Sequence, residues 1–181
     1  MLLDPAEFSF VPPLEAAFEV FRTELERVGR TAFTAWPDRG AYVGNWLGLP
    51  LFMASHHPAV GPLFAPNQQR CPATMQVLRG IPSLVAAGFS WMEPGCHILP
   101  HVDVKPPDVL RTHLGLRIPD RAVLRVGAEH FTWQEGRSLV FDGTIEHETA
   151  NLSDRPRVVL LIDARLNARE LDYLRDCSAR G

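Results

Sequence analysis

The sequence predicts a mainly β protein, a sandwich or barrel of short strands with a helix near each end. Sixteen prolines and thirteen glycines divide the 181 residues into short pieces. Many of these pieces are apolar runs that begin and end at Gly, Pro or Asp. Short strands spaced about 8–12 residues apart favour a sandwich or barrel over alternating strands and helices.

The predicted elements follow from the spacing of apolar residues. Helical spacing predicts a helix over residues 14–29, and Pro12 and Pro13 directly ahead of it suit a helix start. A second helix is predicted over residues 167–177, where two leucines share one side. Residues 42–69 are rich in Gly, Pro, His and Asn with little periodicity, which predicts loops that could cover a site. The predicted strands are 84–92, 97–104, 110–118, 122–126, 131–133, 138–141 and 157–163.

Composition limits the class of protein. A chain of 181 residues with 46% hydrophobic residues supports a single domain over residues 1–181. The net charge of -3 argues against a nucleic-acid or anionic-membrane partner, which would need a basic surface. Three cysteines without a CxxC pair indicate neither a disulfide framework nor a zinc ribbon. We see no signal peptide and no apolar run of about 20 residues, so we expect a cytoplasmic protein.

The most informative motif is His101-x-Asp103, followed 44 residues later by His147. Residues i and i+2 of a strand point to the same side, so His101 and Asp103 face one point. The turn at Asp142-Gly143 would bring a following strand back alongside, carrying His147. Two imidazoles and one carboxylate can bind one face of a divalent metal and leave three positions open, an arrangement typical of non-haem Fe(II) oxygenases.

Other readings of this motif stay open at this point. A short HxD sequence also occurs where each histidine is an ordinary hydrogen-bonded residue without a metal. His97 is a rival ligand, but Pro94, Gly95 and Pro100 exclude the helix that would align it with His101. Zinc suits imidazole and carboxylate ligands too, so these residues alone do not choose the metal.

Positively charged residues indicate an anion site near the motif. Alternation along residues 110–118 places Arg111 and His113 on the face opposite the leucines, which is either solvent or a polar pocket. Arg157 begins a strand that is apolar on both faces, where an arginine is costly unless it is paired. The partner could be an internal carboxylate such as Asp142, or a ligand. The position of Arg157 ten residues after His147 favours a ligand.

The stretch from Phe89 to Asp163 resembles the aspartyl/asparaginyl β-hydroxylase family of Fe(II)/2-oxoglutarate-dependent oxygenases. The matching segments, in order, are FSWMEPGCHILPH, LRTHLGLRIP, RVG, W-x-EG, LVFDGTIEHE and RPRVVLLID. The resemblance implies a double-stranded β-helix, the cupin-like jelly roll, with flanking N- and C-terminal helices.

The resemblance also implies a role for each matching residue. His101 and His147 match the iron ligands, and Asp103 lies at the offset of a third ligand, where some members carry Gly. The residues that match positions beside the co-substrate 2-oxoglutarate are Ser90, His113, Arg157, Arg111 and Trp46. Arg157 would pair with the carboxylate that is remote from the iron.

The implied activity is hydroxylation of an unactivated C–H by a dioxygenase that uses Fe(II), 2-oxoglutarate and O2 and releases succinate and CO2. Members that modify protein domains carry a helical repeat region, and members that act on membrane lipid carry transmembrane segments. We find neither here and expect a small molecule: an amino acid, or a carrier-bound or peptidyl derivative. A cupin-like metal or small-molecule binding protein without turnover and a zinc hydrolase are the alternatives. The oligomeric state is left open.

Overall fold

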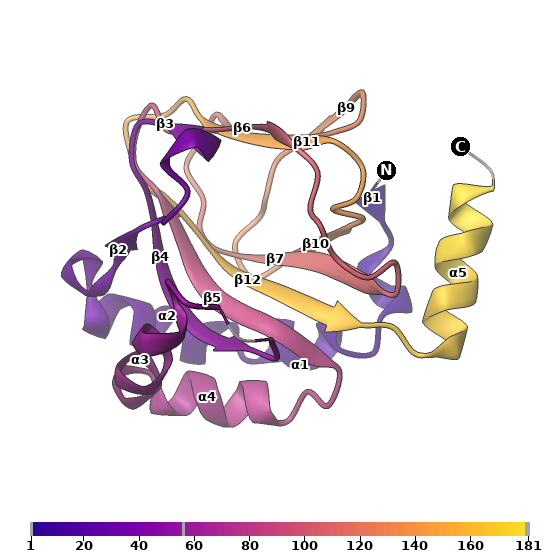
Figure 1. Ribbon diagram of the computed structural model, residues 1–181, viewed down its shortest axis with the longest axis horizontal. Helices are drawn as coiled ribbons and strands as arrows, with labels where there is room; N and C mark the ends of the chain where they lie inside the picture. The colour runs from indigo at the N-terminus through magenta and orange to yellow at the C-terminus, as the bar shows by residue number, and fades with distance from the viewer. Residues whose placement is uncertain (1, 56, 180–181) are drawn as a thin grey trace.

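The computed structural model describes residues 2–55 and 57–179, in which two antiparallel β-sheets face one another. Helices cover the outer face of the larger sheet (Figure 1). The fold is the double-stranded β-helix that the family resemblance implies, with helices near both ends. The mainly β prediction is confirmed.

The larger sheet has seven strands. In spatial order they are β1 (Leu2–Leu3), β10 (Ser138–Phe141), β7 (Val109–Arg117), β12 (Arg157–Arg165), β5 (Leu84–Met92), β4 (Trp46–Met53) and β2 (Thr34–Ala35). The strand that begins at Arg157 is therefore central, as its two apolar faces predict.

The smaller sheet has five strands and faces the larger one (Figure 1). In spatial order they are β3 (Tyr42–Val43), β6 (His97–His101), β11 (His147–Asn151), β8 (Ala122–Val126) and β9 (Glu129–Phe131). The α-helices are α1 (Val11–Ala16), α2 (Phe18–Val28), α3 (Phe64–Arg70), α4 (Pro72–Arg79) and α5 (Ala168–Ser178). Short 3-10 helices are η1 (Pro5–Glu7), η2 (Arg30–Ala32), η3 (Arg39–Ala41) and η4 (Gly61–Leu63).

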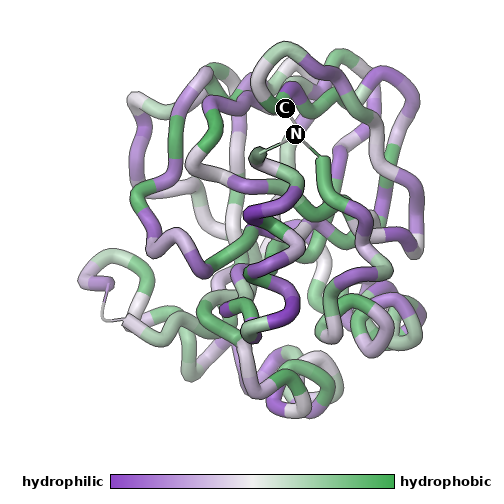
Figure 2. The backbone as a smooth tube through the Cα atoms, turned by 90° about the vertical axis from the view of Figure 1, so that its right-hand side faces the viewer, coloured by the Kyte–Doolittle hydropathy of each residue, from purple (hydrophilic) through white to green (hydrophobic). Residues whose placement is uncertain are grey.

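Alternation along the strands divides the larger sheet into an outer and an inner face. Val158, Leu160 and Ile162 of β12 are fully buried in the main hydrophobic core, together with residues of α1, α2, α4 and α5. The odd-numbered residues of the same strand point the other way, toward the smaller sheet. Figure 2 shows hydrophobic and hydrophilic residues mixed along the chain rather than grouped in long runs. The outer face therefore forms the main core, and the inner face carries a smaller apolar cluster beside the residues of the site.

The predicted helices form with small changes. The helix expected over residues 14–29 is two helices, α1 and α2, joined at Ala17, whose φ of -93° and ψ of 11° leave the helical region. Pro12 and Pro13 lie inside the first turn of α1, where a missing N–H costs no hydrogen bond. Helix α5 begins as predicted, because Asn167 and Glu170 form a reciprocal capping box.

The prediction of loops over residues 42–69 is wrong. Strands β3 and β4 and helix α3 lie in this segment, and α4, which was not predicted, follows it. The sequence of β4 does not show alternation between apolar and polar residues. Its leucines face the core, and its inward positions include Gly48 and Pro50. Pro50 is tolerated because β2 pairs with β4 only at Leu47 and Gly48, which leaves the ladder on that side before Pro50.

Two expectations about the metal motif also need correction. The strand predicted over residues 97–104 ends at His101, so Asp103 lies in the loop that follows. The turn after β10 does not return a strand alongside it, because β11 pairs with β6 and β8 in the other sheet. The turn at Asp142 and Gly143 instead carries the chain from the larger sheet to the smaller one.

We predict that Glu24 of α2 is a stabilising residue. Its buried carboxylate accepts hydrogen bonds from the backbone N–H groups of Ala73 and Thr74, 3.0 and 2.7 Å away, in the first turn of α4. Glu24→Ala leaves these donors without a partner and should lower the free energy of unfolding by about 1–3 kcal/mol in a urea titration. Glu19→Ala, which removes an exposed carboxylate of the same helix, should change it by less than about 0.5 kcal/mol. Equal effects of the two substitutions would contradict the prediction.

Candidate functional site

Two histidines and an aspartate meet where the smaller sheet faces the larger one. His101 ends β6 and His147 begins β11, and the two residues are direct partners in the ladder between these strands. The Asp103 carboxylate lies 4.0 Å from Nε2 of His101 and 3.9 Å from Nε2 of His147. The three side chains offer ligand atoms within 4.8 Å of one another, which a single metal ion could contact together. The structure thus brings together the triad that the sequence predicts.

Hydrogen bonds to the backbone orient both rings. Nδ1 of His101 lies 2.7 Å from the carbonyl oxygen of Leu99, and Nδ1 of His147 lies 2.9 Å from that of Ile145. A carbonyl oxygen can only accept, so each Nδ1 carries the proton and each Nε2 presents a lone pair. Burial lowers the pKa of His147, which favours the neutral ring that a metal needs.

Arg157 lies deeper between the sheets and is almost completely buried. Its guanidinium carbon lies 3.9 Å from the centre of the Trp133 ring, and its Nη2 donates to Nδ1 of His113 over 3.2 Å. The predicted internal partner Asp142 does not pair with it, because the Asp142 carboxylate accepts from Thr144. Among residues 2–55 and 57–179, no carboxylate forms an ion pair with Arg157. Burial lowers the pKa of this guanidinium to about 9.

Arg157 and His113 together present unused donors. Arginine can only donate, so Nδ1 of His113 is the acceptor and Nε2 of the neutral ring carries the hydrogen. Burial and the nearby Arg157 charge lower the pKa of His113 well below its usual value, which keeps the ring neutral. Nε2 of His113 and Nε of Arg157 are both buried without a hydrogen-bond partner. Two buried donors and an unneutralised positive charge suit an anionic acceptor such as a carboxylate.

Ser90 and Trp46 contribute a polar contact on the inner face of the larger sheet. The indole Nε1 of Trp46 donates to the Ser90 hydroxyl oxygen over 3.0 Å, and both residues are buried. The Trp46 ring stacks on Trp36, with ring centres 4.4 Å apart. The structure therefore places these two predicted residues together, in the wall of the cavity beside His101.

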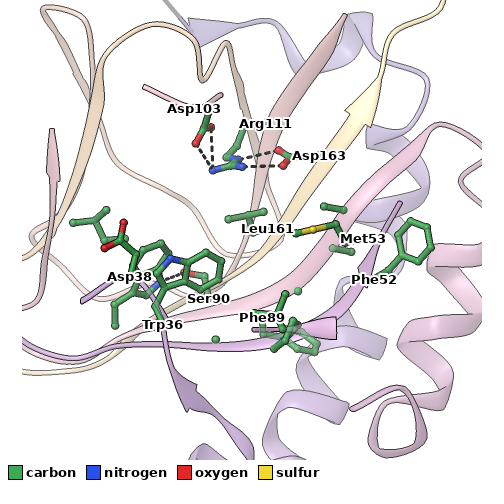
Figure 3. A pocket seen from close by; sticks show the side chains of 18 of the residues that line it. Trp36, Asp38, Phe52, Met53, Phe89, Ser90, Asp103, Arg111, Leu161 and Asp163 are labelled. Atoms are coloured by element: carbon green, nitrogen blue, oxygen red, sulfur yellow. Dashed lines mark hydrogen bonds and ion pairs between the residues drawn. The ribbon is translucent and has the colours of Figure 1, made fainter. Parts of the chain in front are cut away.

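Arg111 differs from Arg157 because it is neutralised. It forms two hydrogen bonds with Asp163 of the neighbouring strand, at 2.9 and 2.8 Å, and its Nη1 lies 3.1 Å from Asp103 (Figure 3). Burial opposes the charge on Arg111, but the two carboxylates overcome this cost and raise its pKa. Burial also opposes ionisation of Asp163, and Arg111 nevertheless lowers the pKa of that carboxyl.

A cavity of about 280 Å³ opens beside the triad. Its floor is the inner face of β4 and β5, where it is lined by the small residues Gly48, Pro50, Ala86 and Gly88. Figure 3 shows Trp36 and Asp38 on one side of it and Phe52 and Met53 on the other. Its polar wall residues include Ser90, His101, Asp103, Arg111 and Asp163. The cavity is thus mainly apolar. Asp103, Arg111 and Asp163 form one polar group, and Ser90 and Asp38 lie apart from it beside Trp36 (Figure 3).

Sequence reasoning missed three residues of this region. Asp163 shares the inward parity of Arg157 on β12, so alternation could have found it. Trp133, which follows β9 and lies against Arg157, belongs to a segment of the family resemblance, W-x-EG, but nothing in the sequence linked it to Arg157. Lys105 is half-buried near Asp103, with its Nζ atom buried, and burial lowers the pKa of its ammonium group. None of the described helices is long and apolar enough to cross a membrane.

Comparison with known proteins supports the family resemblance found in the sequence. The profile of the Aspartyl/Asparaginyl beta-hydroxylase family matches residues 15–166. The chain is 34% identical over 167 residues to the ornithine lipid ester-linked acyl 2-hydroxylase of Rhizobium tropici, covering 88% of this chain and 58% of that protein. It is 37% identical over 106 residues to aspartate beta-hydroxylase domain-containing protein 1 of Mus musculus, covering 54% of this chain and 29% of that protein.

A solved structure supports the fold. The prolyl-4-hydroxylase of Pseudomonas putida superposes with a TM-score of 0.53 at 17% identity, over 84% of this chain and 88% of that one. The chain spans less than two thirds of the length of the curated relatives named above. With the family profile covering most of the sequence, the chain belongs to the aspartyl/asparaginyl β-hydroxylase family.

Proposed function

We propose that the protein is an Fe(II)/2-oxoglutarate-dependent dioxygenase that hydroxylates an unactivated C–H bond and releases succinate and CO2. The observation that carries this proposal is the buried, carboxylate-free guanidinium of Arg157 behind the triad of His101, Asp103 and His147. A site for a metal alone does not need such a cation. A co-substrate that chelates the metal at one end and carries a carboxylate at the other explains both the triad and the unpaired guanidinium of Arg157.

The residues of the site fit Fe(II) and 2-oxoglutarate bound together. His101, His147 and Asp103 would hold Fe(II), since both rings present Nε2 and the carboxylate lies beside them. Arg157 and His113 would bind the distant carboxylate of 2-oxoglutarate with the donors that now lack an acceptor. Trp46 and Ser90 line the cavity next to His101, where they would border the co-substrate. Iron and 2-oxoglutarate supply the activation of O2 for hydroxylation, and the protein orients the reactants and excludes water.

The cavity supports a substrate with an apolar reacting part. Aromatic and aliphatic side chains make up most of its walls, and such a lining gains little from a free, charged amino acid. The relative from Rhizobium tropici is named for 2-hydroxylation of an acyl group in ornithine lipid. We therefore propose an amino-acid-derived substrate, carrier-bound, peptidyl or acylated, whose apolar chain enters the cavity.

The free cysteines Cys71, Cys96 and Cys177 suit a reducing compartment, which supports the proposal of a cytoplasmic protein.

The first test is anaerobic titration with Fe(II) and 2-oxoglutarate. The proposal predicts a weak metal-to-ligand charge-transfer band in the visible, and His147→Ala should abolish it by removing a ligand. His130→Ala, which removes an exposed histidine of β9, is the matched control and should retain the band. Absence of the band in the unchanged protein, or its persistence in His147→Ala, would refute the assignment. A normal band without succinate formation under O2 for any substrate tried would favour a binding protein without turnover.

Arg157→Lys should separate co-substrate binding from metal binding. Lysine retains the charge but loses the planar fork that binds a carboxylate through two parallel hydrogen bonds. We expect 2-oxoglutarate affinity to fall by roughly 10- to 100-fold, equivalent to one strong charge-assisted interaction. Fe(II) affinity measured without 2-oxoglutarate should change little, because Arg157 belongs to another strand and contacts no triad residue. A selective loss of Fe(II) affinity is the opposite result and would show that Arg157 has a different role.

Ala86→Leu should block the cavity without harming the metal site. Ala86 lies on the floor of the cavity, so the larger side chain occupies space meant for substrate. N-lauroyl-ornithine is expected to stimulate succinate formation more than free ornithine, and the substitution should reduce this stimulation about tenfold or more. The charge-transfer band should persist, and Ala128→Leu at an exposed turn should have no effect. Equal stimulation by free ornithine would contradict the apolar-chain proposal.

A further inference from the structure

The position of Asp103 is not explained by the strand that precedes it. Strand β6 ends at His101, and Asp103 lies in an extended loop whose neighbours Val102 and Val104 are exposed. Two contacts from other elements hold it. Its backbone N–H donates to the carbonyl oxygen of Gly143 over 2.8 Å, and its carboxylate meets Nη1 of Arg111. The carboxylate therefore depends on Arg111 for its orientation toward the two histidines.

Arg111 is in turn fixed by Asp163. The two residues are direct partners in the ladder between β7 and β12, and the Asp163 carboxylate accepts from both Nε and Nη2 of Arg111. This fork sets the plane of the guanidinium, so that Nη1 projects toward Asp103. Figure 3 shows the three side chains in one row, with Arg111 between the two carboxylates.

The pair is poorly explained as a device for stability. Strands β7 and β12 are already joined along eight residue pairs, from Val158–Arg117 to Arg165–Val109. A buried ion pair contributes no more to stability than well-packed apolar residues of similar size. The outer faces of these strands already supply such packing in the main core. The Arg111–Asp163 ion pair also contacts Asp103 of the triad, which indicates a role in the site.

We propose that Asp163 is a positioning residue for the metal site: through Arg111 it holds the Asp103 carboxylate in reach of an ion bound by His101 and His147. This inference rests on the proposed metal site and assigns Asp163 a role that it exerts only through Asp103. Outer partners of metal ligands commonly change metal affinity by about 10- to 100-fold when they are removed.

The test is a double-mutant cycle on Co(II) affinity, measured from the visible absorption of Co(II) without 2-oxoglutarate or substrate. Asp163→Asn should weaken Co(II) binding by roughly 10- to 100-fold. In an Asp103→Asn background, the same substitution should change the affinity by about twofold or less, because the group that it orients is no longer a carboxylate. Asp108→Asn is the matched control. It removes a partner of Arg165 beside the same strand pair but outside the site, and should leave Co(II) affinity unchanged.

Each other outcome overturns the proposal in a distinct way. Unchanged Co(II) affinity in Asp163→Asn shows that Asp163 has no positioning role, while the proposed activity still stands. An equal loss in both backgrounds shows that Asp163 acts other than through Asp103. Absence of Co(II) binding by the unchanged protein refutes the metal site itself and both proposals with it. If circular dichroism shows that Asp163→Asn does not fold, Arg111→Lys replaces it in the same cycle, since lysine cannot span both carboxylates.

Discussion

The burial of positive charge between two sheets is the constraint around which this structure is organised. Arg111 and Arg157 lie on the neighbouring strands β7 and β12 and face the same interior, but the groups that surround them differ. Arg111 is matched by carboxylates on both sides, which raise its pKa. Arg157 instead contacts an aromatic face and a neutral imidazole, and burial lowers its pKa. A protein does not retain an unmatched buried charge for stability, because its desolvation is costly. The fold tolerates this cost because the opposite face of the same sheet buries its main apolar core.

Successive residues of a strand point to opposite faces, which allows one sheet to carry a core on one face and a site on the other. On β12 the even-numbered residues pack against the helices, whereas Arg157, Leu161 and Asp163 face the region of the site and Val159 joins a smaller apolar cluster between the sheets. The inward positions of β4 and β5 carry small residues where the cavity lies. One-residue alternation thus separates the residues of the main core from those of the proposed binding site.

Many strands could be predicted from the sequence because each depended on a local pattern. The triad residues were also predicted, but not their placement, because Asp103 lies in a loop and β11 belongs to the other sheet. Strands 84–92, 122–126 and 138–141 have the predicted bounds, because each is an apolar run with clear ends. Strand β4 was missed because its inward residues are small, and alternation between Leu and Gly or Pro does not look like alternation between apolar and polar. The Trp133 contact with Arg157 joins distant segments, so no spacing in the sequence could reveal it. Asp142 was a plausible partner of Arg157 by charge, but its own turn uses its carboxylate.

The origin of the site residues in two separate sheets has a mechanical consequence. The histidines of the triad belong to β6 and β11, whereas His113 and Arg157 belong to β7 and β12 on the opposite sheet. A small molecule that contacts both groups is a cross-link across the barrel and resists any motion that separates its walls. In the proposed reaction, conversion of that molecule to a shorter one would weaken the cross-link at the end of each turnover. Relaxation of the walls would then coincide with the moment when product has to leave.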